Sequence, residues 1–300
     1  MNKTVSIITL FHNKADYSAR CLDGMLRSTH GGVQLVMVDN GSTDGTPEVL
    51  DDAEARALER GWSVERIRFD ENSGAIAGRN AALERSEGEL IAFVDNDVAP
   101  RNLRWMEMLG ERLAAEAELG IVGPKMIYPF RDAAAGDHLI QCAGCEVSPT
   151  GKVNFRGRGD VRSKPEWNEA AEVQCLISAT WLMRREVYEE LGELDERFNP
   201  VQFEDIDYCY RARYAEGRAG PEWRVGYEPS VEMYHFENVT SGRTQALNYR
   251  YLTVKNGLKF KEKWLHRCRE ENGRPESEMQ WKFDLPQVSL DDVGELEFVA

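Results

Sequence analysis

The sequence predicts an α/β fold with a mostly parallel sheet, and two features of its first 125 residues carry this prediction. Apolar, β-branched runs alternate with segments of helical spacing, which is the pattern of βαβ units. Polar residues directly follow several of these runs, at the place where ligands collect along a parallel sheet. The chain has 300 residues, enough for one large domain or two small ones.

The elements expected in the first half follow one another at short intervals. Val5–Leu10 is continuously apolar, as is typical of a strand buried on both faces, and Ala15–Arg27 has the apolar spacing of a helix. The next expected elements are a strand over 34–38, a helix over 47–60, a strand over 62–69, a helix over 73–86, a strand over 90–94, a helix over 103–117 and a strand at 121–123.

The second half of the chain changes character. Residues 130–167 are rich in glycine, arginine and turn residues, which favours hairpins and loops. Helices are expected over 185–191, 203–215 and 245–270. Residues 283–300 contain five acids and no Lys or Arg, so we expect residues 271–300 to form a mobile or loosely docked acidic tail.

Charge and cysteine content exclude several classes of function. The chain has 37 Lys and Arg against 52 Asp and Glu, a net charge of −15, which argues against nucleic acid and against an anionic membrane as the main partner. At most, peripheral membrane association is expected. Six scattered cysteines do not resemble a secreted disulfide framework, and Cys142-Ala-Gly-Cys145 alone is a weak signal for zinc or redox chemistry. With no signal-peptide or membrane-spanning pattern, we expect a cytoplasmic protein.

Asp95-Asn96-Asp97 is the sharpest local motif. Its two carboxylates, placed directly after an expected strand, can both reach one hard cation, and such a cation can bridge the oxygens of a diphosphate. The alternative is an ordinary polar turn that closes the strand.

A second acidic motif, Glu204-Asp205-Ile206-Asp207, begins an expected helix. Buried carboxylates in such a cluster are candidates for a raised pKa and for general-base catalysis. Two structural alternatives are a favourable interaction with the helix dipole and an Asp207–Arg211 pair one helical turn apart.

Two weaker signals complete the set. Asn72-Ser73-Gly74, followed by Arg79, places free backbone N–H groups and a cation at a helix start, which suits phosphate as well as an ordinary cap. His235 is a candidate third ligand to a hard cation, although a lone histidine is more often a hydrogen-bonded structural residue.

Taken in order, these motifs resemble the inverting glycosyltransferases of family 2, which have the GT-A fold. The resemblance covers roughly residues 4–265, and the order of the motifs makes it specific. The matching segments are Val5-Ser6-Ile7-Ile8 with Asn13, residues 38–46, Asn72 and Gly74 with Arg79-Asn80, residues 93–97, residues 184–187 through Gly192, residues 195–198, residues 204–207 with Arg211, and His235.

The resemblance implies a role for each matching position. Asp95 and Asp97 would hold Mn²⁺ or Mg²⁺, with His235 as a further ligand. Asp205, with Glu204 beside it, would be the general base. The expected nucleotide-sugar-binding residues are Thr9, Phe11, Asn13, Asp39 (at the base or ribose), Asn72, Gly74, Arg79, Asp95 and Asn96.

The resemblance also implies how the chain is organised. Residues 1–270 would form a single GT-A domain, with a nucleotide-sugar-binding half over 1–125 and an acceptor-binding and catalytic-base half over 126–270. In the loop after the first strand, His12 takes the place of the family's more usual aromatic residue, which leaves the nucleotide base open.

The implied activity is transfer of a sugar from a nucleoside-diphosphate sugar to an acceptor hydroxyl. The acceptor would be a glycan, a lipid-linked molecule or a protein. A homodimer is one expected form of the protein. One alternative is a sugar nucleotidyltransferase, but it would be expected to carry a Gly-rich, basic loop where this chain has Phe11-His12-Asn13-Lys14. Another is a sugar-nucleotide-binding module without turnover.

Overall fold

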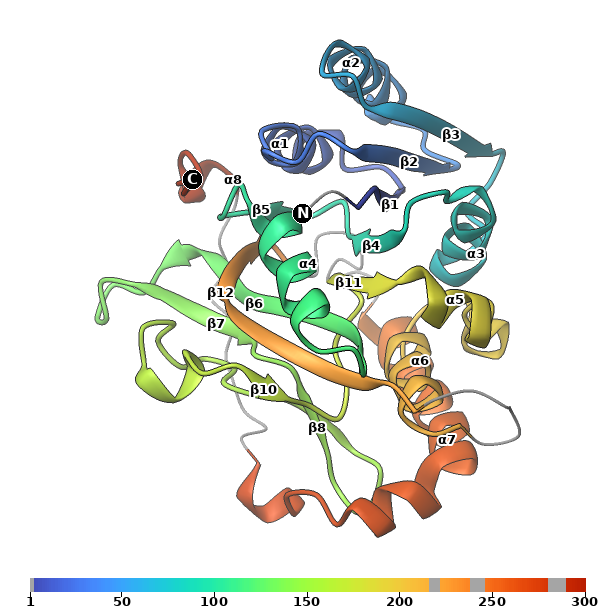
Figure 1. Ribbon diagram of the computed structural model, residues 1–300, viewed down its shortest axis with the longest axis vertical. Helices are drawn as coiled ribbons and strands as arrows, with labels where there is room; N and C mark the ends of the chain where they lie inside the picture. Colours follow the sequence, from blue (N-terminus) through green and yellow to red (C-terminus); the bar gives the residue numbers. More distant parts are fainter. Residues whose placement is uncertain (1–2, 216–221, 238–245, 280–289) are drawn as a thin grey trace.

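The computed structural model describes residues 3–215, 222–237, 246–279 and 290–300. Its centre is a ten-stranded sheet in which β10, β12, β6, β11, β4, β1, β2 and β3 are neighbours in that order, while β5 pairs with β12 and β7 with β6. Helices lie on both faces of this sheet (Figure 1). The sequence prediction of a mostly parallel α/β fold is confirmed.

The first half of the chain forms the parallel part of the sheet. Its strands are β1 (Val5–Phe11), β2 (Val33–Asn40), β3 (Ser63–Phe69) and β4 (Leu90–Val94), and all of their pairings are parallel. Helices α1 (Ala15–Leu26) and α2 (Thr46–Glu59) lie side by side, and α3 (Ala75–Arg85) packs on β1 and β2. The polar ends of β1, β2 and β4 therefore meet at one edge of the sheet.

The second half extends this sheet with a strand that the sequence did not predict. β11 (Thr180–Arg184) lies antiparallel between β4 and β6 (Leu119–Arg131), and Leu182 pairs with both Ala92 and Val122. β12 (Arg224–His235) runs parallel to β6, while β5 (Val98–Pro100) and β10 (Ala171–Glu172) pair antiparallel with β12.

The remaining described elements are a hairpin region and five further helices. The predicted hairpin region contains β7 (His138–Cys142), β8 (Cys145–Val147) and β9 (Val153–Phe155), and β8 pairs with β9. The helices are α4 (Trp105–Ala115), α5 (Arg185–Leu191), α6 (Glu204–Arg213), α7 (Ala246–Glu271) and α8 (Leu290–Val293), with short 3-10 turns at 165–167, 196–198 and 276–278. All six cysteines are buried and free.

The described end of the expected acidic tail lies against the body of the protein. Leu103 N donates to Val299 O at 2.7 Å, and Val299 N donates to Arg101 O at 2.7 Å. Residues 280–289 lie outside the described part of the chain. Among the helices that the structure describes, none is long and apolar enough to cross a membrane.

Candidate active site

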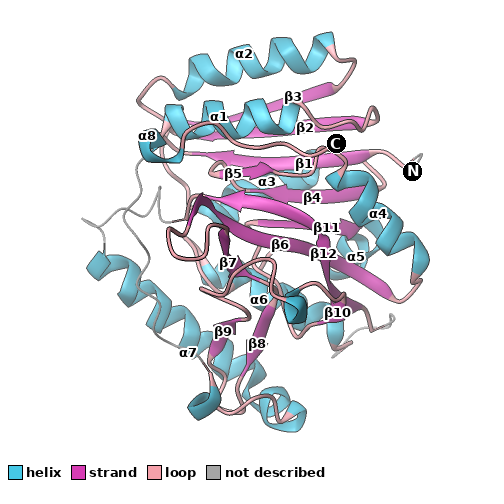
Figure 2. Ribbon diagram, turned by 90° about the vertical axis from the view of Figure 1, so that its left-hand side faces the viewer, coloured by secondary structure: helices cyan, strands magenta, loops and turns pink. Residues whose placement is uncertain are grey.

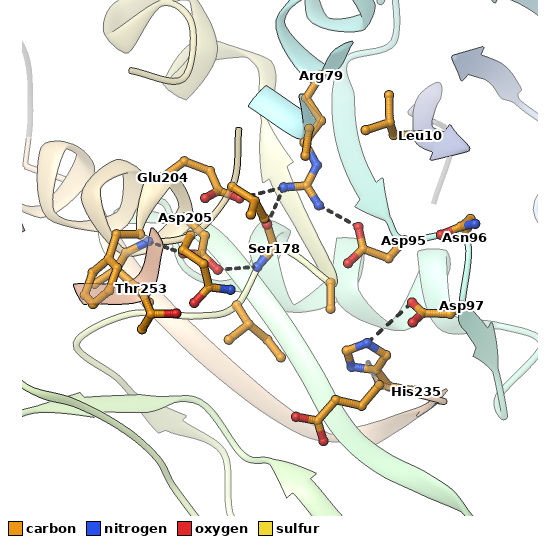
Figure 3. Close-up of a pocket in the computed structure, with 18 of the residues that line it drawn as sticks. Leu10, Arg79, Asp95, Asn96, Asp97, Ser178, Glu204, Asp205, His235 and Thr253 are labelled. Carbon is orange, nitrogen blue, oxygen red and sulfur yellow. Dashed lines mark hydrogen bonds and ion pairs between the residues drawn. The ribbon is translucent and has the colours of Figure 1, made fainter. Parts of the chain in front are cut away.

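A cavity of about 460 Å³ opens at the carboxyl ends of β1 and β4 and extends to the first turn of α6. Figure 3 shows Asp95, Asp97 and His235 on one side of it and Glu204 and Asp205 on the other, with Arg79 and Ser178 between them. Seven of the residues predicted for the site line this cavity: Arg79, Asp95, Asn96, Asp97, Glu204, Asp205 and His235.

One group of three side chains has the composition of a metal site. Asp95 and Asp97 follow β4, and His235 ends β12, where the His235–Val98 pairing with β5 brings the two segments together. One ligand atom of each side chain lies within 4.8 Å of those of the other two. Two carboxylates and an imidazole are ligands that Mn²⁺ accepts, and the carboxylates also suit Mg²⁺.

Gln141 of β7 sets the orientation of the His235 ring. The Gln141 Oε1 atom accepts a hydrogen bond from His235 Nδ1 at 3.2 Å, which leaves His235 Nε2 facing Asp97 Oδ1 at 3.4 Å. Burial opposes protonation of the imidazole, but the neighbouring Asp97 carboxylate outweighs it and raises the pKa of His235 to about 9. A cation at this place would take the position of that proton, so the three residues fit a divalent metal.

Arg79 of α3 connects the two sides of the cavity. Its guanidinium donates to Asp95 Oδ1 at 2.5 Å and to Glu204 Oε1 at 2.9 Å, and its side chain is only 7% exposed. It also donates to Ser178 Oγ at 2.7 Å. Burial disfavours the charged guanidinium, yet the surrounding carboxylates overcome this and raise the pKa of Arg79. This buried cation partly compensates the acids that line the cavity.

The carboxylates at the start of α6 have different surroundings. Glu204 is 3% exposed and pairs with Arg79, whereas Asp205 is half-buried and lines the cavity. Asp205 Oδ2 accepts from Ser178 N at 3.1 Å, and its Oδ1 accepts from Ile206 N at 2.8 Å. Burial, reinforced by the charge of Asp205, raises the pKa of Glu204 to about 7, and burial also raises the pKa of Asp205. Asp205 therefore has the better access to a molecule in the cavity.

Asp207 belongs to the packing between helices rather than to the cavity. Its Oδ1 accepts from Trp264 Nε1 at 2.7 Å and pairs with Lys263 Nζ at 2.7 Å, both from α7. Arg211 donates to the backbone oxygens of Leu191 and Glu193. The Asp207 carboxylate, for which a pair with Arg211 was one alternative, thus faces α7 instead.

Four further residues predicted to bind the nucleotide are not among those that line the cavity: Asp39 lies at the end of β2, and Asn13, Asn72 and Gly74 lie in the loops after β1 and β3. Asp39 accepts from Ser42 N and from Arg68 Nη1, at 2.9 and 2.6 Å. The other three residues also hold these loops together: Asn13 Oδ1 accepts from Thr43 N at 2.8 Å, and Asn72 Oδ1 accepts from Gly74 N at 2.9 Å. Their roles toward a nucleotide stay predictions.

The side chains of Thr9 and Phe11 do not line the cavity. Both are 0% exposed, and Phe11 belongs to the hydrophobic core. Leu10 and His12 line the cavity instead, because successive side chains of a strand point to opposite faces. The predicted roles of Thr9 and Phe11 toward a nucleotide stay predictions, and their side chains are not the ones of this segment that line the cavity.

Sequence reasoning also missed several polar residues of the cavity, among them Gln141 and Ser178. Ser178 lies in the least polar long stretch of the chain, and a serine within such a stretch is a signal that could have been followed. Gln141 lies in a hairpin region whose pairing the sequence pattern does not define, so nothing linked it to His235.

The fold and the cavity define an α/β protein in which a candidate cation site lies across one cavity from the carboxylates of Glu204 and Asp205. Residues 6–192 match the family described as Glycosyl transferase family 2, and the chain belongs to this family. This confirms the resemblance found in the sequence.

Two curated relatives match parts of the chain. The putative teichuronic acid biosynthesis glycosyltransferase TuaG of Bacillus subtilis (strain 168) is 39% identical over 93 residues, which cover 31% of this chain and 35% of the relative. The O-antigen biosynthesis protein RfbC of Myxococcus xanthus is 30% identical over 208 residues, which cover 65% of this chain and 15% of the relative. The chain thus spans 35% or less of the length of these relatives.

Two solved structures share the fold. GalNAc-T7 with UDP, GalNAc and Mn²⁺ has a TM-score of 0.64 at 16% identity, over 90% of this chain and 49% of that one. The mannosyltransferase PcManGT from Pyrobaculum calidifontis, in complex with GDP-Man and Mn²⁺, has a TM-score of 0.55 at 18% identity, over 78% of this chain and 57% of that one. These similarities confirm the expected GT-A fold.

Proposed function

We propose that the protein is a metal-dependent inverting glycosyltransferase that moves a sugar from a nucleoside-diphosphate sugar to an acceptor hydroxyl. The observation that carries this proposal is that the Asp95–Asp97–His235 cluster and the Glu204–Asp205 pair line one cavity. The first group suits a cation on a diphosphate, and the second offers a base for the acceptor.

The donor end of the cavity lies beside β1 and β4. Asp95, Asp97 and His235 would hold Mn²⁺ or Mg²⁺, and when bound the cation would stabilise the negative charge that develops on the departing nucleoside diphosphate. Leu10 and His12 border this end. The Mn²⁺ complexes of two proteins with this fold, one with UDP and one with GDP-Man, support a donor of this class.

Asp205 is the proposed general base. Its carboxylate would take the proton of the acceptor hydroxyl as the hydroxyl oxygen forms a bond to the anomeric carbon and the bond to the diphosphate breaks. The hydrogen bonds from Ser178 N and Ile206 N hold the carboxylate in place, and its raised pKa makes it a stronger base than an exposed aspartate. One base suffices for a single displacement, which inverts the anomeric centre.

The acceptor is proposed to be a hydroxyl of a glycan. The names of TuaG and RfbC, which refer to teichuronic acid and O-antigen biosynthesis, support this class. Phe155 of β9, Phe203 and Thr253 also line the cavity and would contact such an acceptor.

Separating donor binding from turnover tests the proposal. In a thermal-shift assay, UDP- or GDP-sugars should raise the melting temperature more with Mn²⁺ than without it, because ligands of the folded state stabilise it. Asp97→Asn should lose this Mn²⁺-dependent part. Asp205→Asn should keep it and lower turnover by about 10²- to 10⁴-fold.

The matched control is Asp52→Asn, which changes an aspartate of α2 that is 67% exposed and should leave both measurements unchanged. The assignment of the base is wrong if Asp205→Asn retains full turnover. The metal site is wrong if Asp97→Asn responds to Mn²⁺ as the original protein does.

A further inference from the structure

Helix α7 carries a strip of apolar side chains that the described part of the chain leaves uncovered. Tyr251, Val254 and Leu258 are 66%, 64% and 63% exposed. Their spacing of three and four residues places them on one face of the helix. The opposite face, which includes Phe260 and Trp264, is buried. Figure 2 shows α7 along the outer edge of the molecule.

Positive charge is concentrated on the same helix. Residues 250–269 contain seven Lys and Arg and one Glu, although the whole chain has a net charge of −15. At 3.6 residues per turn, Arg250 and Lys261 flank the apolar strip on one side, and Lys255 and Lys259 flank it on the other. Arg250 and Lys255 are exposed. The combination of an exposed apolar strip and flanking cations defines the outer face of α7.

We propose that the outer face of α7 binds the surface of a lipid bilayer that contains anionic phospholipids. Tyr251, Val254 and Leu258 would enter the boundary between headgroups and acyl chains. The exposed Arg250 and Lys255 would reach lipid phosphates, with their aliphatic stems along the apolar strip. The acidic remainder of the surface would be repelled by the same bilayer, so the charge distribution also orients the protein.

The charge favours a bilayer over a second copy of this chain. A two-fold contact between the outer faces of two α7 helices would bring the same cations together, and that repulsion opposes the pairing. The bilayer would lie on a different side of α7 from the cavity, to which the helix contributes Thr253. Membrane binding therefore goes beyond the proposed sugar transfer and does not depend on it.

Vesicle co-sedimentation of the full chain tests this proposal without any sugar substrate. The protein should sediment with vesicles of phosphatidylcholine mixed with phosphatidylglycerol, far less with phosphatidylcholine alone, and less as salt is raised. The variant with Tyr251→Ser, Val254→Ser and Leu258→Ser should bind at least about tenfold more weakly. The double variant Arg250→Gln and Lys255→Gln should bind roughly 25-fold more weakly, since each cation contributes roughly fivefold.

Leu58→Ser is the matched control, because Leu58 is 54% exposed on α2, away from this face, and its loss should leave vesicle binding unchanged. Circular dichroism of each variant checks that it is folded. Equal binding to both kinds of vesicle, or equal binding by all variants, would overturn the proposal. So would a dimer in sedimentation velocity that the triple variant abolishes, because a second copy would then cover the outer face.

Discussion

Gln141 illustrates how one residue can act on a metal site without being a ligand. It is 1% exposed and holds His235 Nδ1, so that Nε2 points to the Asp95–Asp97 pair. Gln141→Leu should weaken Mn²⁺ binding about 10- to 100-fold, because the ring loses the partner that fixes its tautomer and orientation.

Mn²⁺ titration followed by electron paramagnetic resonance measures this effect directly, since free and bound Mn²⁺ give different signals. Gln141→Glu is the conservative variant, which keeps an acceptor oxygen and should largely restore affinity. Unchanged Mn²⁺ affinity in Gln141→Leu would show that His235 does not depend on this hydrogen bond.

Glu204 should make the stability of the folded chain depend on pH. Its pKa is about 7 in the folded chain against the ordinary value of 4.5, so the folded state retains a proton that the unfolded state releases. The resulting contribution to stability is present below about pH 4.5 and is lost as the pH rises to about 7. Glu204→Gln stays neutral throughout and should not show this loss.

We therefore expect the melting temperature of Glu204→Gln minus that of the original protein to be higher above pH 7 than near pH 5. Differential scanning calorimetry across this range provides the measurement. A relative melting temperature that is constant, or that falls with rising pH, would contradict the raised pKa of Glu204.

At the scale of elements, the start of α3 depends on a position that only glycine tolerates. Gly74 has φ of 93° and ψ of 159°, and a Cβ there would lie 2.2 Å from Asn199 Oδ1. Gly74→Ala should reduce the free energy of unfolding by about 1–3 kcal/mol more than a glycine change without this clash.

Gly61→Ala provides that comparison, because Gly61 also has a positive φ, of 78°, but a Cβ there would meet nothing within 4 Å. Urea denaturation of the two variants isolates the contact with Asn199. Equal losses would mean that the Asn199 side chain moves aside without cost.

The elements also show what local sequence can predict. Buried parallel strands such as β1 and β4 have apolar runs that identify them, and the intervening helices have regular spacing. β11 has a similar apolar run, but nothing in its residues says that it enters the sheet antiparallel between β4 and β6. That placement comes from long-range packing rather than from local propensity.

At the scale of the whole molecule, the candidate site is assembled from distant parts of the chain. The sequence predicted Asp95, Asp97 and His235 separately, and the pairing of β5 with β12 brings them together. Gln141 contacts His235, and Ser178 contacts Asp205 on the other side of the cavity, across segments that have no common motif. Motifs therefore predicted the residues that bear charge, while the neutral residues that orient them became visible only in the fold.

Charge is also distributed unevenly over the molecule. The net charge of −15 argued against nucleic acid and against an anionic membrane as the main partner. The structure places acids around a candidate cation site and cations along the outer face of α7. Local charge, rather than the total, decides what each part of the surface can bind.

Proton NMR of the first sugar product tests the central claim most directly. The protein would be incubated with Mn²⁺ and an α-linked UDP- or GDP-sugar, with water or a glycan as acceptor. The signal of the anomeric proton of the transferred sugar would be recorded before the product can mutarotate. A single displacement at the candidate site predicts a β product that Asp205→Asn does not form. An α product, or no release of nucleoside diphosphate from any donor, would contradict the account.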